Sequence, residues 1–386
     1  MTRSARLLLI ACVSLFTSVA SADPAVRTMR VPNDGLQPQV AVDDAGKVHL
    51  IYFKNDASHG DVFYVHSTDG GKSFSRPMRV NSVDGSAIAT GTIRGAHLAI
   101  GRDRRVHVAW NGSDVVTLKG AGKVVPMYYA RLNDAGNAFE PQRNVIDRHF
   151  GLDGGGSVAA DKDGNVYVAW HAPEQKGQDE GSRGIWIARS SDDGKTFAPE
   201  TRAFAEPTGA CGCCGMRLFA DLRGSVYALY RSANEMVNRD MYLLRSDDHA
   251  KSFQGTKVAP MKIGMCVMSS EAMAQAPDGI VAAWETNSQI FWSHVAPKGP
   301  KISEATPAPG EPRGRKHPAL ATNARGDVLL VWTEGTGWNK GGSIAWQVYD
   351  ASGKPIAGAS GKQDGLPAWS LPTAFAEREG AFTILY

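Results

Sequence analysis

Val40-Ala-Val-Asp-Asp-Ala-Gly-Lys-Val-His-Leu-Ile-Tyr52 is the first of seven copies of one pattern in this chain of 386 residues. Each copy has a short apolar run, a polar turn that usually ends in Gly, and a second apolar run that closes on Trp or Tyr. The other copies span Leu98 to Trp110, Val158 to Trp170, Leu218 to Tyr230, Ala272 to Trp284, Leu320 to Trp332 and Ala374 to Tyr386. Apolar and polar residues alternate in these runs with the two-residue period of a β-strand. The copies recur every roughly 47 to 60 residues, which is the period of a β-propeller blade.

The first 22 residues have the composition of a cleaved signal peptide. Arg3 and Arg6 form a basic start, Leu7 to Val19 form an apolar stretch, and Ala20-Ser-Ala22 matches an A-x-A cleavage site. Leu9-Ile-Ala-Cys12 resembles a lipoprotein box, but it leaves too short an apolar stretch before the cysteine. We therefore expect cleavage after the A-x-A site and export of the mature chain.

The net charge and the hydropathy narrow the classes of partner. The formal charge is +3, and loss of Arg3 and Arg6 with the signal peptide leaves +1. A near-neutral chain gives no electrostatic reason to expect nucleic acid or an anionic membrane as a partner. No later apolar run approaches the roughly 20 residues of a membrane span. We expect a periplasmic or secreted protein, folded as a single β-propeller domain over residues 23–386.

A second motif follows several of the repeats. Ser67-Thr-Asp-Gly-Gly-Lys-Ser-Phe74 and Ser190-Ser-Asp-Asp-Gly-Lys-Thr-Phe197 fit S-x-D-x-G-x-[S/T]-F, and Leu132 to Phe139 and Ser246 to Phe253 match it in part. Asp and Ser side chains in such a turn hydrogen-bond to local backbone groups, Gly takes a positive φ, and the aromatic ring packs into the blade. These turns are Asp boxes. With them the mature chain resembles the sialidase (BNR-repeat) superfamily, and within it a functionally uncharacterised exported subgroup that has a C-x-C-C motif.

The predicted fold is an all-β propeller with four-stranded blades. In the first blade we expect strands at Gln39–Asp43, Val48–Phe53, Val62–Ser67 and Pro77–Val80. Seven copies favour seven blades, and six blades, the number that the sialidase resemblance implies, are the alternative. The chain ends on the second strand of the seventh repeat, so Val26–Val31 is expected to complete the last blade and to cover its free edge.

Polar residues gather in the segments that lead into the first strand of each blade. In a propeller these strands line the central axis, and the residues just before them face the mouth of the channel. The predicted mouth residues are Arg94, His97, Asp153, Cys211, Cys213, Cys214, Arg217, Cys266, Glu271, Arg315 and His317. A concave site with a few convergent polar groups is the usual position of a binding site.

The sialidase resemblance assigns roles to some of these residues. A sialidase holds the carboxylate of its substrate with several arginines, because guanidinium groups pair bidentately with carboxylates. Arg94, Arg217 and Arg315 come from three blades and are the predicted clamp. Glu271 and Asp153 are the predicted catalytic residues, Glu271 as the partner of a nucleophile and Asp153 as the acid. An enzyme with this site would be an exo-sialidase-like glycoside hydrolase.

Other features of the sequence extend or weaken that assignment. Met29-Arg-Val-Pro32 resembles an R-I-P segment of the superfamily, which makes Arg30 a fourth candidate arginine. His97 and His317 are predicted to contact the ligand, because they lie near the mouth. The resemblance also implies a nucleophilic Tyr, and no Tyr falls on a predicted axial position.

Four cysteines remain after cleavage, and three of them form Cys211-Gly-Cys-Cys214. An even number of cysteines in an exported chain favours disulfides, with Cys266 paired to Cys213 or Cys214 because vicinal cysteines cannot bridge without strain. The same thiols, with nearby methionines, are soft ligands suited to copper, and cysteine alone would suit zinc. A redox-active thiol pair is the third interpretation, although the spacing is not C-x-x-C.

Three functions are consistent with the sequence. The first is binding, extending to hydrolysis, of a carbohydrate or other anionic small ligand at the axial mouth. The second is a periplasmic metal-binding protein that holds copper or zinc with the four cysteines. The third is a non-catalytic scaffold that binds a protein partner, with the cysteines serving the fold. Only the second function requires a metal or cofactor.

Overall fold

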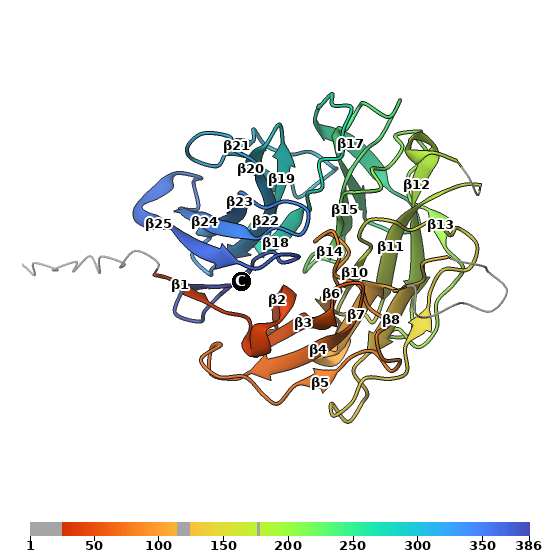
Figure 1. The fold of residues 1–386 in the computed structure, drawn as a ribbon, viewed down its shortest axis with the longest axis horizontal. Coiled ribbons are helices and arrows are strands. Elements are labelled where there is room, and N and C mark those ends of the chain that lie inside the picture. The colour runs from red at the N-terminus through yellow and green to blue at the C-terminus, as the bar shows by residue number, and fades with distance from the viewer. Residues whose placement is uncertain (1–24, 114–123, 176–177) are drawn as a thin grey trace, which may run out of the picture.

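The computed structural model describes residues 25–113, 124–175 and 178–386, and the predicted signal peptide lies outside them. The described chain forms strands β1 to β27 in seven sheets, which surround a central axis (Figure 1). Its helices are three 3-10 turns at Pro32–Asp34, Arg102–Arg104 and Glu180–Ser182. Within these residues no helix has the length and apolar character to cross a membrane. The predicted all-β propeller is confirmed, with seven blades rather than six.

Six blades are four-stranded antiparallel meanders that follow one another in chain order. Blade 1 comprises β2 (Leu36–Val42), β3 (Val48–Asp56), β4 (His59–Ser67) and β5 (Met78–Arg79), and blade 2 comprises β6 (His97–Ile100), β7 (Val106–Asn111), β8 (Met127–Arg131) and β9 (Arg143–Asn144). Blade 3 comprises β10 (Ser157–Ala160), β11 (Val166–Pro173), β12 (Arg183–Ser190) and β13 (Thr201–Arg202), and blade 4 comprises β14 (Met216–Ala220), β15 (Val226–Arg231), β16 (Met241–Ser246) and β17 (Gln254–Ala259). Blade 5 comprises β18 (Ala272–Ala276), β19 (Gly279–Thr286), β20 (Gln289–Val295) and β21 (Thr306–Pro307), and blade 6 comprises β22 (Arg315–Thr322), β23 (Val328–Glu334), β24 (Gly342–Tyr349) and β25 (Pro355–Leu366).

The seventh blade joins the two ends of the described chain. It contains β26 (Thr373–Ala376), β27 (Phe382–Leu385) and β1 (Val26–Met29), and so has three strands rather than four in the part that the structure describes. Strand β1 pairs in parallel with β27, with Val26 opposite Phe382 and Met29 opposite Leu385. The predicted closure by the N-terminal strand is confirmed, and it covers the edge that β27 would otherwise expose.

The first strands of neighbouring blades pack side by side around the axis, and β26 of blade 7 contacts β2 of blade 1. Each second strand is buried on both faces, and its closing aromatic residue packs between blades. Trp110, Trp170 and Trp284 are at most 1% exposed in this position. Tyr52 and Tyr230 occupy the same position and are equally inaccessible. These tyrosines therefore belong to the core, as the repeat pattern predicted.

The Asp boxes form turns that satisfy their own polar groups. In the second full match, Ser190 Oγ donates to Asp192 Oδ1 over 2.7 Å, and the Gly194 amide donates to Ser190 Oγ over 2.9 Å. The backbone amide of Thr196 donates to Asp192 Oδ1 over 2.9 Å. Equivalent hydrogen bonds hold the turns at 67–73 and 246–252. The predicted turn chemistry is confirmed in all three.

Candidate functional site

The first strands of all seven blades line an axial channel with a cavity of about 390 Å³. Much of the wall is apolar and small, because alanines recur along these strands, as at Ala41, Ala99 and Ala159. The polar side chains of the wall lie mainly where the first strands begin. This end of the channel is the mouth that the repeat pattern predicted.

Strand register places four polar side chains at one level of the channel. Gln39, His97, Ser157 and Arg217 each pair with the residue that precedes the closing aromatic residue of the second strand, in blades 1 to 4. We call these four residues the polar tier. The equivalent positions in blades 5, 6 and 7 hold Ala272, Ala319 and Thr373. The channel is therefore polar on one side of this level and lined by small side chains on the other.

Arg217 is the cation of the polar tier. Its Nη1 donates to Gln39 Oε1 over 2.9 Å, and because blades 1 and 4 lie three blades apart in a ring of seven, the guanidinium reaches across the axis. Burial lowers the pKa of Arg217 to about 10, so the group stays charged at neutral pH. Its Nε has no hydrogen-bond partner, and no carboxylate of the described chain forms an ion pair with it.

His97 supports Arg217 as a neutral imidazole. Its Nδ1 lies 2.8 Å from Ser157 Oγ and 3.5 Å from Arg217 Nη1. Ser157 Oγ also accepts from the Leu218 amide, so its proton is free to be donated to His97. Burial, followed by the charge of Arg217, lowers the pKa of His97 to about 3. Nδ1 therefore accepts hydrogen bonds, and the tier holds one positive charge rather than two.

Glu271 is the acidic side chain of the channel wall. The residue is 6% exposed, and neither carboxyl oxygen has a hydrogen-bond partner among the described residues. Burial, reinforced by the charge of Cys214, raises the pKa of Glu271 well above its usual value. The raised pKa favours the protonated form of the carboxyl group, which can donate a hydrogen bond.

The other two arginines of the predicted clamp are committed to protein groups. Arg94 Nη2 pairs with Asp153 Oδ1 at 2.6 Å and Arg94 Nε donates to the Asp153 carbonyl at 2.7 Å, which joins the loops of blades 2 and 3. Arg315 is 6% exposed, pairs with Glu334 at 3.2 Å and lies over the ring of Trp332. The structure therefore places one arginine of the three on the channel wall and holds the other two in ion pairs.

The two remaining candidates for ligand contact, His317 and Arg30, lie in different parts of the molecule. His317 is buried beside the channel, where its Nδ1 lies 3.2 Å from Ser270 Oγ, and burial lowers its pKa to about 3. Arg30 lies on the ring of Tyr386 in blade 7. The structure brings His97, Arg217 and Glu271 together on the channel wall, with His317 behind it.

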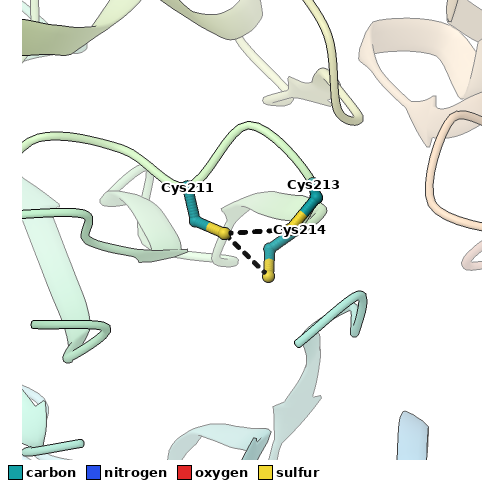
Figure 2. Close-up of side chains that lie close together, drawn as sticks. All are labelled: Cys211, Cys213 and Cys214. Atoms are coloured by element: carbon teal, nitrogen blue, oxygen red, sulfur yellow. Dashed lines mark hydrogen bonds between the residues drawn. The ribbon is translucent and has the colours of Figure 1, made fainter. Parts of the chain in front are cut away.

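The C-x-C-C segment forms a tight loop before β14, just behind the channel wall. Figure 2 shows its three side chains turned toward one another. The Cys211 sulfur lies 3.4 Å from that of Cys213 and 3.2 Å from that of Cys214, and all three sulfurs lie within 4.8 Å of one another. Glu180 holds the loop from outside, because its Oε1 accepts from the Gly212 amide over 2.9 Å. A Cβ atom at Gly212 would meet the guanidinium of Arg183, which would have to move to accommodate it.

The structure does not bring Cys266 to Cys213 or Cys214, the predicted partners. The four cysteines are not bridged in it, and Cys266 is exposed and lies outside the cluster. The reason is local: the turn between Cys211 and Cys214 brings these three sulfurs together within one loop. Met261 packs on the cluster. The sequence pattern did not predict this contact, because Met261 does not lie next to any of the cysteines in the chain.

No protein-family model and no curated protein matches this chain. Similar solved structures include a protein of unknown function from Dyadobacter fermentans DSM 18053, which is 14% identical over 89% of this chain and 98% of its own, with a TM-score of 0.55. An α-L-arabinanase from Penicillium chrysogenum, complexed with arabinobiose, is 14% identical over 84% and 95%, with a TM-score of 0.53. A Hadza microbial sialidase is 11% identical over 86% and 74%, with a TM-score of 0.51. These likenesses confirm the sialidase-like propeller fold that the Asp boxes predicted.

Proposed function

We propose that this protein binds an anionic carbohydrate at the mouth of the axial channel, with Arg217 pairing with the carboxylate of the sugar. The observation that carries the proposal is the state of Arg217: a partly buried guanidinium on the channel wall, held by neutral groups and without a carboxylate partner in the described chain. A charge removed from water in this way is stabilised by an opposite charge. The ligand would supply that charge.

The surroundings of Arg217 suit a sugar more than a simple ion. The cavity of about 390 Å³ lies within the size range of small-molecule sites. In its protonated form Glu271 can donate to a hydroxyl or to a ring oxygen, and Gln39 Oε1 can accept from a hydroxyl. The comparison structures support a carbohydrate, since one is an arabinanase complexed with arabinobiose and another is a sialidase.

We propose binding without hydrolysis by the sialidase route. That route needs a tyrosine nucleophile, and no tyrosine lines the described channel wall. Tyr128 and Tyr129 of β8 are buried in blade 2, and the Tyr129 hydroxyl contacts His107. Glu271 is the one carboxyl group of the described wall, whereas glycoside hydrolysis ordinarily uses two.

Calorimetric titration with matched sugars tests this function. N-acetylneuraminic acid and galacturonic acid are the anionic probes, and galactose and arabinobiose are the neutral ones. We expect an anionic probe to bind at least about tenfold more tightly than a neutral one, since a charged hydrogen bond contributes about 1.5–3 kcal/mol. Arg217→Gln should remove that preference. Equal binding of all four sugars, or an unchanged preference in the variant, would contradict the proposal.

Two controls separate the site from general charge effects. Arg104→Gln removes an exposed arginine from the turn between β6 and β7, at the far end of the blade, and should leave the affinity unchanged. From about pH 5 to about pH 9 His97 stays neutral and Arg217 stays charged, so a fall in affinity within that range would report ionisation of Glu271, whose pKa is raised. The affinity should fall as pH passes about 10, where Arg217 loses its proton. Turnover of a sialoside by the wild-type protein would show that binding is not the whole function.

A further inference from the structure

The cysteine cluster is a second site, distinct in chemistry from the channel. It lies behind the channel wall, where the Gly215 amide donates to the Ser269 carbonyl over 3.0 Å and so ties the cysteine loop to the segment that carries Glu271. Cys211 and Cys214 are buried, and Cys213 is half-buried. Three thiols that meet within 4.8 Å in a closed loop form a ready set of soft ligands.

His171 is an independent sign that the place beside this cluster receives a ligand. In blades 1 to 6, the residue after the closing aromatic residue of the second strand lies at the mouth. Asn111 in blade 2 binds the loop that leads into blade 3, with its Nδ2 donating to the Gly154 carbonyl over 2.9 Å and its Oδ1 accepting from the Gly156 amide over 3.2 Å. His171 is the same residue in blade 3, and the loop that leads into blade 4 is the cysteine loop.

Unlike Asn111, His171 has no protein partner. The residue is 1% exposed, and both of its ring nitrogens lack a hydrogen bond among the described residues. By the same arrangement it faces the cysteine loop, and burial lowers the pKa of His171 to about 3. A buried imidazole is ordinarily hydrogen-bonded, so this one marks an incomplete polar site.

Two buried arginines, each paired with a glutamate, belong to the surroundings of the three thiols. Arg231 is 1% exposed and pairs with Glu285 at 2.9 Å. Arg239 is 4% exposed and pairs with Glu180 at 2.6 Å, and it interacts electrostatically with Cys211 and Cys213. The Nε atoms of both arginines have no partner among the described residues. Such groups stabilise a cluster that carries net negative charge, as a metal–thiolate centre does.

We propose that Cys211, Cys213 and Cys214 bind one Cu(I) ion as three thiolates. Each thiol that is protonated beforehand releases its proton to solvent on binding, and no electron is transferred. Copper(I) is favoured over zinc because thiolates are soft ligands and because no fourth His, Cys, Asp or Glu donor of the described chain joins the 4.8 Å group. Structural zinc almost always takes four ligands. The proposed copper site is independent of the proposed sugar site, so either proposal can fail while the other holds.

Anaerobic titration of the reduced protein with Cu(I), in competition with the chromophoric chelator bathocuproine disulfonate, tests this proposal. We expect one Cu(I) per chain to be retained against the chelator. Cys213→Ser should lower the affinity by more than the roughly 100-fold that loss of an outer residue costs. Cys266→Ser removes an exposed cysteine outside the cluster and is the matched control, which should bind as the wild type does. Loss of binding in both variants, or in neither, would overturn the assignment.

Two further arms distinguish the competing chemistries. An equimolar amount of Zn²⁺ should not displace the copper, and displacement would overturn the three-coordinate soft site.

His171→Asn, which introduces the residue found at the equivalent position of blade 2, should change the Cu(I) affinity by less than about tenfold, the lower bound for loss of an outer residue. A larger loss would make the imidazole a fourth ligand and overturn three-coordination. A reduced, folded protein that binds no Cu(I) would show that these thiols serve the fold alone; circular dichroism melting establishes the folded state of each variant.

Discussion

The Asp-box turns and the channel mouth both consist of polar groups, but these groups find their hydrogen-bond partners in opposite ways. In the turn at 190–196, Ser, Asp and Thr satisfy one another and the backbone within seven residues of chain. At the mouth, Arg217 of blade 4 reaches Gln39 of blade 1, and His171 and Glu271 keep buried atoms without partners in the described chain. A turn whose polar groups all bond within the turn stabilises the fold. Polar groups that find no partner in the folded chain are available to bind a ligand. The following predictions test that contrast.

The largest effect is expected where the mouth depends on a buried ion pair. Arg231 and Glu285 lie on neighbouring blades, and their side chains are 0% and 3% exposed. Glu285→Gln would leave the guanidinium buried without its counter-charge, which typically costs about 3–5 kcal/mol of unfolding free energy. Chemical denaturation measures this loss of unfolding free energy. Asp84→Asn, which breaks the exposed pair with Arg79, should stay within about 0.5 kcal/mol; equal losses in the two variants would remove the distinction between the mouth and the surface.

A smaller loss of unfolding free energy is expected from the Asp-box turn at 190–196. Asp192→Ala removes the acceptor for Ser190, Thr196 and the local backbone. Because the turn is open to solvent, we expect a loss of about 1 kcal/mol rather than the full contribution of charged hydrogen bonds. Asp163→Ala, at an exposed position of a turn in the same blade, is the control. A loss as large as that of Glu285→Gln would mean that the turn supports the whole blade.

The contribution of Asp192 should also depend on pH. Partial burial raises the pKa of Asp192, but hydrogen bonds from Thr196 and Ser190 outweigh it and lower the pKa from 3.8 to about 2. A depressed folded-state pKa means that the contribution is fully present above about pH 4 and is lost as pH falls through about 2. The stability difference between wild type and Asp192→Ala should shrink over that interval. A difference that stays constant down to pH 2 would show that the carboxylate contributes nothing through its charge.

The smallest effect concerns the imperfect Asp box. Ala250 has a φ of 59°, where the full matches have Gly71 and Gly194 at 80° and 76°. Ala250→Gly should stabilise the protein by about 0.5 kcal/mol, because relief of the left-handed backbone outweighs the lost methyl and the greater chain entropy of glycine. Thermal unfolding can resolve the change. Destabilisation would mean that packing of the buried methyl group outweighs the backbone strain.

The Asp-box turns and the blades that carry them could be predicted from the sequence because their interactions are local. The Asp-box residues, the closing aromatic residues and the alternation of the strands all act within about ten residues, so spacing alone predicted the blades, their number and the closing strand. At the mouth, spacing predicted which residues approach the axis, among them Arg217, His97 and Glu271. It did not predict that Arg94 and Arg315 would be paired with Asp153 and Glu334, because those partners depend on how neighbouring blades meet.

The sequence by itself determined a seven-bladed propeller and the end of it where polar groups collect, because each repeat encodes its own strands and turns. Only the tertiary structure decided which of those groups are free. The reach of Arg217 across the axis, the isolation of His171 and the separation of Cys266 from the other three cysteines all depend on contacts between blades. Those contacts involve residues far apart in the chain, and no local pattern records them.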